Sequence, residues 1–297
     1  MNLLNRRSFV GLLGAGCVSV NSVSAAAIAR RRFPVAFFEK PLQFLNYREL
    51  AEVLGEIGFD GIEATIRKGG HIAPERAVDE LPACVDELRA GGQQILVMAT
   101  SINRVDQPGA EALLRTAAKL GVKKYRLNGL PYSGDRPILQ QLDDYRAQLV
   151  ELAALNRELG ITGVYQNHAG SRNVGGPIWD LDYLLKGIES DHLGIAYDIR
   201  HAMVEGSSAW PVSLKMIRPR VRCVYVKDFV FEGAKPKNVP MGQGIVGAGF
   251  YNAIKKWDSR PPISIHAPYL RAVNQQNMKA ALSRLKADFD WLQSKLA

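Results

Sequence analysis

Two side chains with catalytic chemistry follow the apolar segment that begins at Leu193. The segment runs Leu-Gly-Ile-Ala-Tyr, ends at Asp198, and is followed three residues later by His201. A buried carboxylate must be paired or bound, because removing its charge from water is costly. In a parallel barrel of strands and helices, active groups sit at the carboxyl ends of the strands. Asp198 and His201 are therefore candidate active-site residues. The alternative interpretation is that Asp198 only caps the next helix, with His201 in its first turn.

Segments of the same kind recur along the chain, each followed by a polar loop and an amphipathic helical segment. Eight are predicted as strands: residues 34–38, 61–64, 94–98, 124–127, 163–167, 193–198, 221–226 and 262–266. They are largely apolar rather than alternating, which is typical of parallel strands covered by helices. The strict alternation predicts an α/β fold, a single-domain (β/α)8 barrel over residues 33–297. An open doubly wound sheet is the alternative, but no glycine-rich phosphate loop follows the first strand.

Helical segments fit the gaps between these strands and have recognisable ends. The first begins at a capping asparagine, Asn46, and stops before Gly58, and others stop before a glycine or begin at a proline. The predicted helices are residues 46–57, 74–90, 108–120, 139–159, 179–187, 210–217, 249–257 and 274–296.

Polar residues gather where five of the predicted strands end. They are Glu63, then Gln166, Asn167 and His168, then Asp198, then Lys227 and Asp228, and finally His266. Because parallel strands in a barrel end on one face, these side chains are expected to converge. Other interpretations remain open for single members. Glu63 could pair with a neighbouring strand end, Lys227 could pair with Asp228, and His266 could be a core histidine. His71, in a glycine-rich loop, is either substrate-facing or merely exposed.

Several of these segments, in this order, resemble the xylose isomerase-like TIM barrels, the sugar phosphate isomerase/epimerase superfamily. The resemblance covers about residues 33–296 and is carried by residues 58–63, 166–168, 198–201, 224–228 and 240–246. The resemblance implies a TIM barrel that acts on a small carbohydrate.

The resemblance also implies a divalent metal, usually held by Glu, Asp, His and Glu from strands five to eight. The matching positions in this chain are Gln166, Asp198, Tyr225 and His266. Only the aspartate is retained, so we expect a weakly held metal (Mn, Mg or Zn) with Asp198, His266 and Gln166 as its ligands. The two-carboxylate proton transfer of the family would be altered accordingly.

The predicted function is an exported sugar isomerase, epimerase or lyase that moves a proton next to a carbonyl group. Such a step needs a base and a group that stabilises the oxygen. Glu63, His168 and His201 are the candidate bases, and Lys227 is the candidate for stabilising an enolate. The predicted substrate-binding residues are His71, Asn167 and Asp228. The alternative is a non-catalytic barrel that binds a sugar or a partner and has lost the family's metal site.

The net charge does not indicate nucleic acid as a partner. Five of the nine net positive charges come from arginines in residues 1–32, which contain no acid. Residues 33–297 keep only the other four, and no stripe of lysine and arginine interleaved with aromatics occurs there.

Residues 1–32 are predicted to be a twin-arginine export signal rather than part of the fold. Arg6 and Arg7 precede a short apolar segment, residues 9–20, and small residues that suit a cleavage site. The apolar segment is too short to span a bilayer, so no stable membrane insertion is expected after its removal. The protein is thus predicted to be periplasmic or otherwise exported. Cys84 and Cys223 are predicted to be buried thiols, not a disulfide framework.

Changing both Arg6 and Arg7 to Lys is expected to leave the precursor in the cytoplasm, because this export route recognises the arginine pair. Cell fractionation with an antibody against the protein measures the outcome. Normal export of the double variant would contradict the twin-arginine interpretation.

Overall fold

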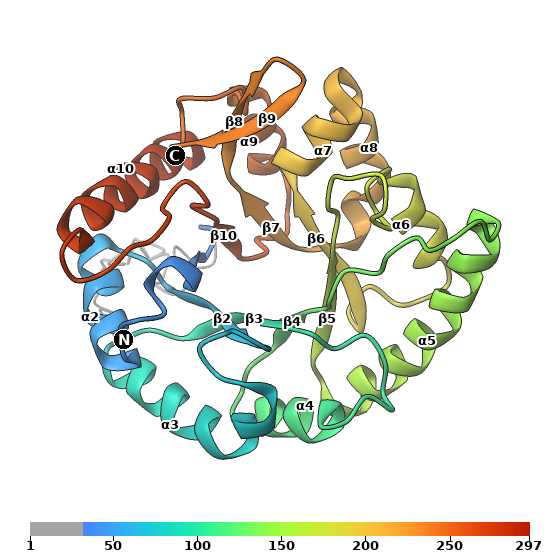
Figure 1. Ribbon diagram of the computed structural model, residues 1–297, viewed down its shortest axis with the longest axis horizontal. Coiled ribbons are helices and arrows are strands. Elements are labelled where there is room, and N and C mark those ends of the chain that lie inside the picture. Colours follow the sequence, from blue (N-terminus) through green and yellow to red (C-terminus); the bar gives the residue numbers. More distant parts are fainter. Residues whose placement is uncertain (1–31) are drawn as a thin grey trace, which may run out of the picture. The chain divides into compact units, whose positions relative to one another are not determined.

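Eight parallel strands close into a barrel at the centre of the protein (Figure 1). The structure is a computed structural model that describes residues 32–297, so the predicted export signal lies outside the described residues apart from Arg32. Around the barrel the strand order is β1, β10, β7, β6, β5, β4, β3, β2. The prediction of a closed eight-stranded barrel is confirmed. The strands are β1 (Val35–Phe38), β2 (Gly61–Ile66), β3 (Ile95–Thr100), β4 (Lys124–Arg126), β5 (Thr162–Gln166), β6 (Leu193–Asp198), β7 (Val221–Val226) and β10 (Ile263–Ile265).

Helices form a ring outside the barrel, and their ends follow from the sequence (Figure 1). Helix α2 begins with a capping box between Asn46 and Glu49 and ends at Gly58, whose φ of 110° suits glycine. The helices are α2 (Tyr47–Ile57), α3 (Ala77–Ala90), α4 (Ala110–Lys119), α5 (Ile138–Leu159), α6 (Trp179–Leu184), α7 (Ile199–Gly206), α8 (Trp210–Ile217), α9 (Ala248–Lys255) and α10 (Met278–Leu296). None of the described helices is long and apolar enough to cross a membrane.

Two elements differ from the predicted list. Helix α7 follows β6 directly, and Asp198 is its N-cap, with the His201 backbone N–H donating to Asp198 Oδ1 at 3.2 Å. This helix is absent from the predicted list, but the alternative interpretation, in which Asp198 caps a helix with His201 in its first turn, is confirmed. The second element is an antiparallel hairpin of β8 (Asp228–Glu232) and β9 (Lys235–Val239), which the sequence analysis treats as the loop after strand seven.

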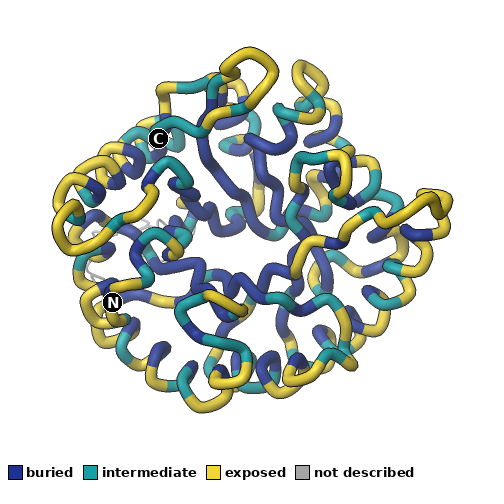
Figure 2. The backbone as a smooth tube through the Cα atoms, in the orientation of Figure 1, coloured by how far each residue is buried: buried dark blue, intermediate teal, exposed yellow. Residues whose placement is uncertain are grey.

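The barrel interior has its own small core, distinct from the large core between strands and helices. Its members are Val97, Val164, Ala196, Cys223 and Tyr225, from strands β3, β5, β6 and β7. Because side chains alternate along a strand, residues two positions further on face the same interior. Figure 2 shows the strands as the buried centre of the molecule. This core is thus the floor beneath the polar strand ends. Cys84 and Cys223 are both free and buried, as predicted.

Asp228 holds the loop that follows the hairpin. Its Oδ1 accepts hydrogen bonds from the backbone N–H groups of Phe229 and Val246, at 2.9 and 3.0 Å. Its Oδ2 accepts from those of Gly242 and Gly244, each at 2.9 Å. All of these bonds are charge-assisted, so the carboxylate organises the backbone rather than facing an open space.

Replacing Gly244 by Ala is expected to destabilise the fold by about 1–3 kcal/mol, because the added methyl group would collide with Asp228 Oδ1 and the Phe229 carbonyl oxygen. Urea denaturation measures the loss. The matched control is Gly249→Ala in α9, where the nearest atom of another residue, on Trp210, is 3.8 Å from the new group. Equal stabilities of the two variants would contradict the role given to Asp228.

Candidate active site

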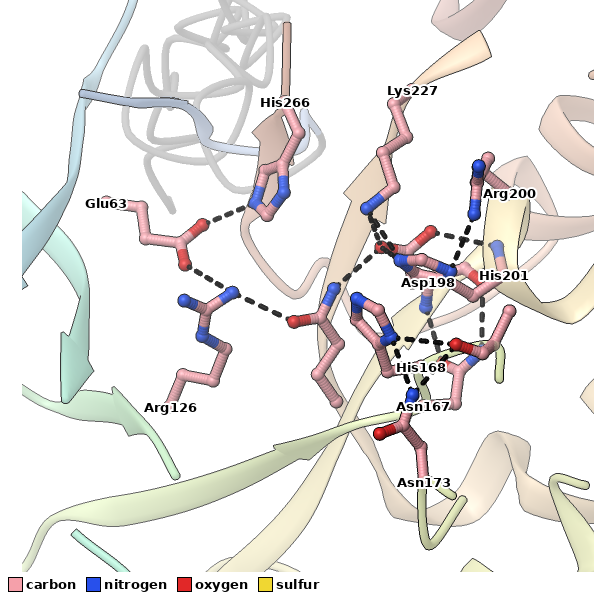
Figure 3. A network of polar contacts seen from close by, with 12 residues as sticks. Glu63, Arg126, Asn167, His168, Asn173, Asp198, Arg200, His201, Lys227 and His266 are labelled. Carbon is pink, nitrogen blue, oxygen red and sulfur yellow. Dashed lines mark hydrogen bonds and ion pairs between the residues drawn. The ribbon is translucent and has the colours of Figure 1, made fainter. Parts of the chain in front are cut away.

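A cavity of about 840 Å³ opens where the barrel strands end. Its polar wall includes Arg126, Gln166, Lys227 and His266, each at or just beyond the carboxyl end of its strand. In Figure 3 the polar side chains form two groups, one around Glu63 and His266 and one around Asp198, His201 and Lys227. The predicted convergence of strand ends is therefore found for most of the predicted residues.

The first group is a carboxylate–histidine pair. Glu63 is fully buried, and its Oε2 accepts from the Ser264 hydroxyl and lies against His266 Nε2, both at 2.7 Å. A bulge in the pairing of β2 with β3 falls between Ile62 and Glu63, and bulges re-aim side chains in this way. The His266 ring stacks on Phe38 with centroids 4.6 Å apart. Glu63 and these contacts fix the orientation of the imidazole.

The ionisation of this pair follows from its surroundings. Burial by itself would raise the pKa of Glu63, but the nearby His266 and Arg126 and the two hydrogen bonds bring that pKa down to about 2. Burial lowers the pKa of His266, against the opposing influence of Glu63. At neutral pH Glu63 is thus ionised and His266 is neutral, with its proton on Nε2. Nδ1 of His266, which bonds to no residue within 32–297, carries the lone pair.

The second group is built on Asp198. Its Oδ2 lies 2.7 Å from Lys227 Nζ and accepts from Gln166 Nε2, also at 2.7 Å. Asp198 is fully buried, which would raise its pKa, but Lys227 and His201 lower it well below the usual range. The same carboxylate caps α7 through Oδ1. Both interpretations of this residue thus hold together: it caps the helix and it belongs to the polar site.

His201 lies between two basic side chains. Arg200 Nη1 is 3.0 Å from its Nδ1, and Lys227 Nζ is 3.0 Å from its Nε2. Burial lowers the pKa of His201 to about 2, so the ring is neutral and has a single acceptor nitrogen. Arginine can only donate, so Nδ1 accepts and Nε2 carries the proton. Lys227 Nζ thus lies within hydrogen-bond distance of both Asp198 Oδ2 and His201 Nε2. Burial lowers the pKa of Lys227, against the opposing influence of Asp198.

Arg126 and Gln166 connect the two groups. Arg126 Nη1 donates to Gln166 Oε1 at 2.8 Å and lies 3.5 Å from Glu63 Oε1. Gln166 then donates to Asp198 through its other amide atom. Arg126 was not among the residues predicted from the sequence. The sequence does contain a signal for it, because Arg126 is a basic residue at the end of the short strand β4, on the same side of that strand as Lys124.

The remaining predicted residues support or flank the site. The Asn167 side chain bonds both backbone groups of Asp198, at 2.7 and 3.0 Å, and so holds the end of β6. The His168 ring lines the cavity and lies 3.9 Å from that of His201, centroid to centroid. Burial, followed by the charge of Lys227, lowers the pKa of His168. Lys227 and Asp228 do not pair with each other, since their partners differ.

His71 belongs to a neighbouring cluster around Glu39. Its Nδ1 is 3.2 Å from Glu39 Oε2, and its ring stacks on Tyr47 at 4.1 Å. Glu39 is fully buried at the end of β1 and also accepts from the Thr65 hydroxyl at 2.8 Å. Glu39 was not among the residues predicted from the sequence, although it directly follows the predicted strand 34–38. Substrate binding by His71, Asn167 and Asp228 stays a prediction.

The predicted metal ligands, as they stand, do not fit a divalent ion. Gln166 and Asp198 are bonded to each other and to Arg126 and Lys227, and His266 Nε2 is bonded to Glu63. Across residues 32–297, no three His, Cys, Asp or Glu side chains are grouped so that they could hold a metal. Tyr225, at the remaining family position, is fully buried, and burial raises its pKa well above the usual value. Weak metal binding at Asp198, His266 and Gln166 stays a prediction.

Comparison with known proteins places this geometry in a family. The family model described as xylose isomerase-like TIM barrel matches residues 51–294. No curated protein sequence matches the chain at a significant level.

Solved structures share the fold at low sequence identity. The IOLI protein with a bound zinc atom has a TM-score of 0.73 and 18% identity, over 89% of this chain and 99% of that one. The 3-keto-D-glucoside 4-epimerase from E. coli has a TM-score of 0.68 and 14% identity, over 89% and 100%. A xylose isomerase-like TIM barrel protein from Mycobacterium smegmatis, in complex with magnesium, has a TM-score of 0.61 and 15% identity, over 89% and 98%. At such identities the likeness shows the fold alone.

Replacing Glu63 by Gln is expected to lower the free energy of unfolding at pH 7 by about 3 kcal/mol, the worth of a pKa shift from 4.5 to about 2. A carboxyl pKa lowered by folding stabilises the protein fully above its unfolded value, and that stabilisation is lost as the pH falls toward 2. The difference between wild type and variant should therefore shrink on acidification. Urea denaturation from pH 7 to pH 3 measures it, with the exposed Glu151→Gln as control. A difference that stays constant with pH would contradict the ionised pair.

Proposed function

We propose that this chain, which belongs to the xylose isomerase-like TIM barrel family, is a sugar isomerase or epimerase that moves a proton next to a carbonyl group with its own side chains. The observation that carries the proposal is the pairing of two buried carboxylates with two cavity-facing basic groups. Glu63 supports His266, and Asp198 supports Lys227, at 2.7 Å in each case. Both basic groups line the same cavity.

His266 is the first acid–base group in this mechanism. Its neutral ring presents Nδ1 as the acceptor, while Nε2 donates to Glu63. When Nδ1 takes a proton from the carbon next to the carbonyl, the ionised carboxylate stabilises the imidazolium that forms. A carboxylate supports a catalytic histidine in this way in many hydrolases.

Lys227 is the second acid–base group, and in this proposal it acts on the opposite face of the reacting carbon from His266. As an amine it can take a proton, and as an ammonium it can return one, with Asp198 stabilising the charged form. An epimerase needs one group on each face of the reacting carbon, and an isomerase needs a group that carries the proton to the next carbon. His201 keeps the Lys227 amine oriented through their 3.0 Å contact.

Arg126 stabilises the negative oxygen of the enolate that the proton transfer creates. Its guanidinium lines the cavity, is 8% exposed and is positioned by Gln166. A fixed positive group in a site shielded from water stabilises a developing oxyanion strongly. The epimerase among the similar structures supports the choice of reaction. The arginine pair Arg6 and Arg7 supports the further proposal that the protein acts outside the cytoplasm.

A non-catalytic sugar-binding or partner-binding barrel is the second candidate. It is favoured by Gln166 and Tyr225 at positions where the family resemblance expects metal ligands. It leaves unexplained why two buried carboxylates each support a basic group in one cavity.

Proton exchange tests the proposal. The full chain is incubated in deuterated water with D-xylulose, D-fructose, a 3-keto-D-glucoside or a 2-keto sugar acid, and proton NMR follows the hydrogen next to the carbonyl. Exchange is expected with wild type and should fall at least about a hundredfold in Lys227→Met and in His266→Gln, the loss typical of removing an acid–base group. Lys256→Met, an exposed lysine next to α9, is the matched control.

Chelation separates this mechanism from a metal-dependent one. Exchange that survives EDTA supports proton transfer by side chains, and exchange that EDTA abolishes and Mn²⁺ restores contradicts it. Sugar binding without exchange in any sample would favour the non-catalytic barrel.

A further inference from the structure

We infer that the cavity binds a sugar bearing an anionic group, a carboxylate or a phosphate, and that Arg67 and Arg126 hold this group. The sugar part of the inference rests on the proposed function. The anion-binding part rests on Arg67, a charge that the proposed proton transfer does not use, and on Arg126, which lines the same cavity.

The described wall of the cavity contains basic groups and no acid. Besides Arg126 and Lys227, the basic residues that line it are Lys40, Arg67 and Arg271. Glu63 and Asp198, the carboxylates that contact Arg126 and Lys227, are completely buried and do not line the cavity. Each already faces one of the basic groups, Arg126 at 3.5 Å and Lys227 at 2.7 Å. The wall is therefore left with an excess of positive charge.

Arg67 is a cavity-lining arginine for whose charge the described residues provide no ion-pair partner. It follows β2 directly, and its guanidinium lies 5.6 Å from the centre of the Phe38 ring. Within the described part of the chain its side chain makes no ion pair and donates no hydrogen bond. Arginine carries five N–H donors and does not lose its charge in proteins, and Arg67 lines the cavity.

Arg126 shares the same aromatic ring with Arg67. Its guanidinium lies 5.3 Å from the centre of Phe38. Burial, followed by the charge of Arg126, lowers the pKa of Arg67. Guanidinium groups repel at short range unless an anion lies between them, and their planar N–H forks match carboxylate and phosphate oxygens. An anionic group on the substrate would satisfy both.

The geometry also orients the rest of the substrate. An anionic group at Arg67 and Arg126 would lie on the Phe38 side of the cavity, where His266 stacks on the same ring. The adjoining part of the substrate then extends toward His266 and Lys227. A cavity of about 840 Å³ falls in the range that holds small-molecule ligands.

Binding of matched sugars tests the inference, independently of turnover. Isothermal titration of the full chain compares D-glucuronate, D-glucose 6-phosphate and neutral D-glucose. At least one anionic sugar is expected to bind about tenfold or more tightly than D-glucose, and less tightly as NaCl is raised, because salt screens charge. The two anionic probes distinguish a carboxylate from a phosphate.

Arg67 variants assign the effect to its residue. Arg67→Gln is expected to weaken binding of the preferred anionic sugar about tenfold to a hundredfold, the usual worth of hydrogen bonds to a charged group, and to leave D-glucose unchanged. Arg67→Lys, which keeps the charge, should recover part of the loss. Arg76→Gln, an exposed arginine paired with Glu80 outside the cavity wall, is the matched control.

Three results would overturn the inference: D-glucose binding as tightly as both anionic sugars, no anionic sugar binding at millimolar concentration, or Arg67→Gln binding them like wild type. Anion binding without proton exchange would keep this inference and remove the proposed reaction. Proton exchange on neutral sugars, with no preference for anionic sugars in binding, would remove this inference and keep the proposed reaction.

Discussion

Two carboxylates that are completely buried at the mouth of the barrel, Glu63 and Asp198, determine how the rest of the site is built. Moving a carboxylate out of water is costly unless partners compensate for it. Glu63 therefore lies against Ser264, His266 and Arg126, and Asp198 lies against Gln166 and Lys227. Because these partners come from different strands, satisfying two charges ties most of the barrel's upper rim into one network.

This network stabilises less than its number of contacts suggests. Attraction within a buried pair largely offsets the cost of removing both charges from water, although breaking the pair by deleting one partner is expensive. The stability of the barrel comes instead from its apolar cores, inside the strands and between strands and helices. The polar network contributes a defined arrangement of charged groups, which is what proton transfer and ligand selection need.

The site has positively charged side chains beside its buried carboxylates. The similar structures include one with zinc and one with magnesium. In this chain arginine and lysine side chains stand beside the carboxylates. A guanidinium supplies positive charge and directed donors without any dependence on metal supply. Its charge is single and spread over a plane, so it polarises a carbonyl oxygen less than a divalent ion does. Such a site suits substrates that bring negative charge of their own.

The sequence by itself determined the fold and the strand ends that carry chemistry. Apolar segments separated by amphipathic helices specify a (β/α)8 barrel, because each strand must be covered on its outer face. The polar residues after these segments must then meet on one face, which is why Glu63, Asp198, Lys227 and His266 could be named in advance. The bounds of helix α7 and the β8–β9 hairpin were not predicted, because short elements leave little periodicity.

Only the tertiary structure decided which polar residue faces which. Sequence order cannot show that Glu63 and His266, 203 positions apart, are neighbours across the closed barrel. It cannot show that Asp228 turns to four backbone N–H groups while the adjacent Lys227 turns to Asp198. The roles of Arg126 and Arg67 likewise became clear only in the folded protein, because the energetic cost of a charge depends on the groups around it. Closure of the barrel creates those neighbours, and pairing of buried charges selects among the orientations that closure allows.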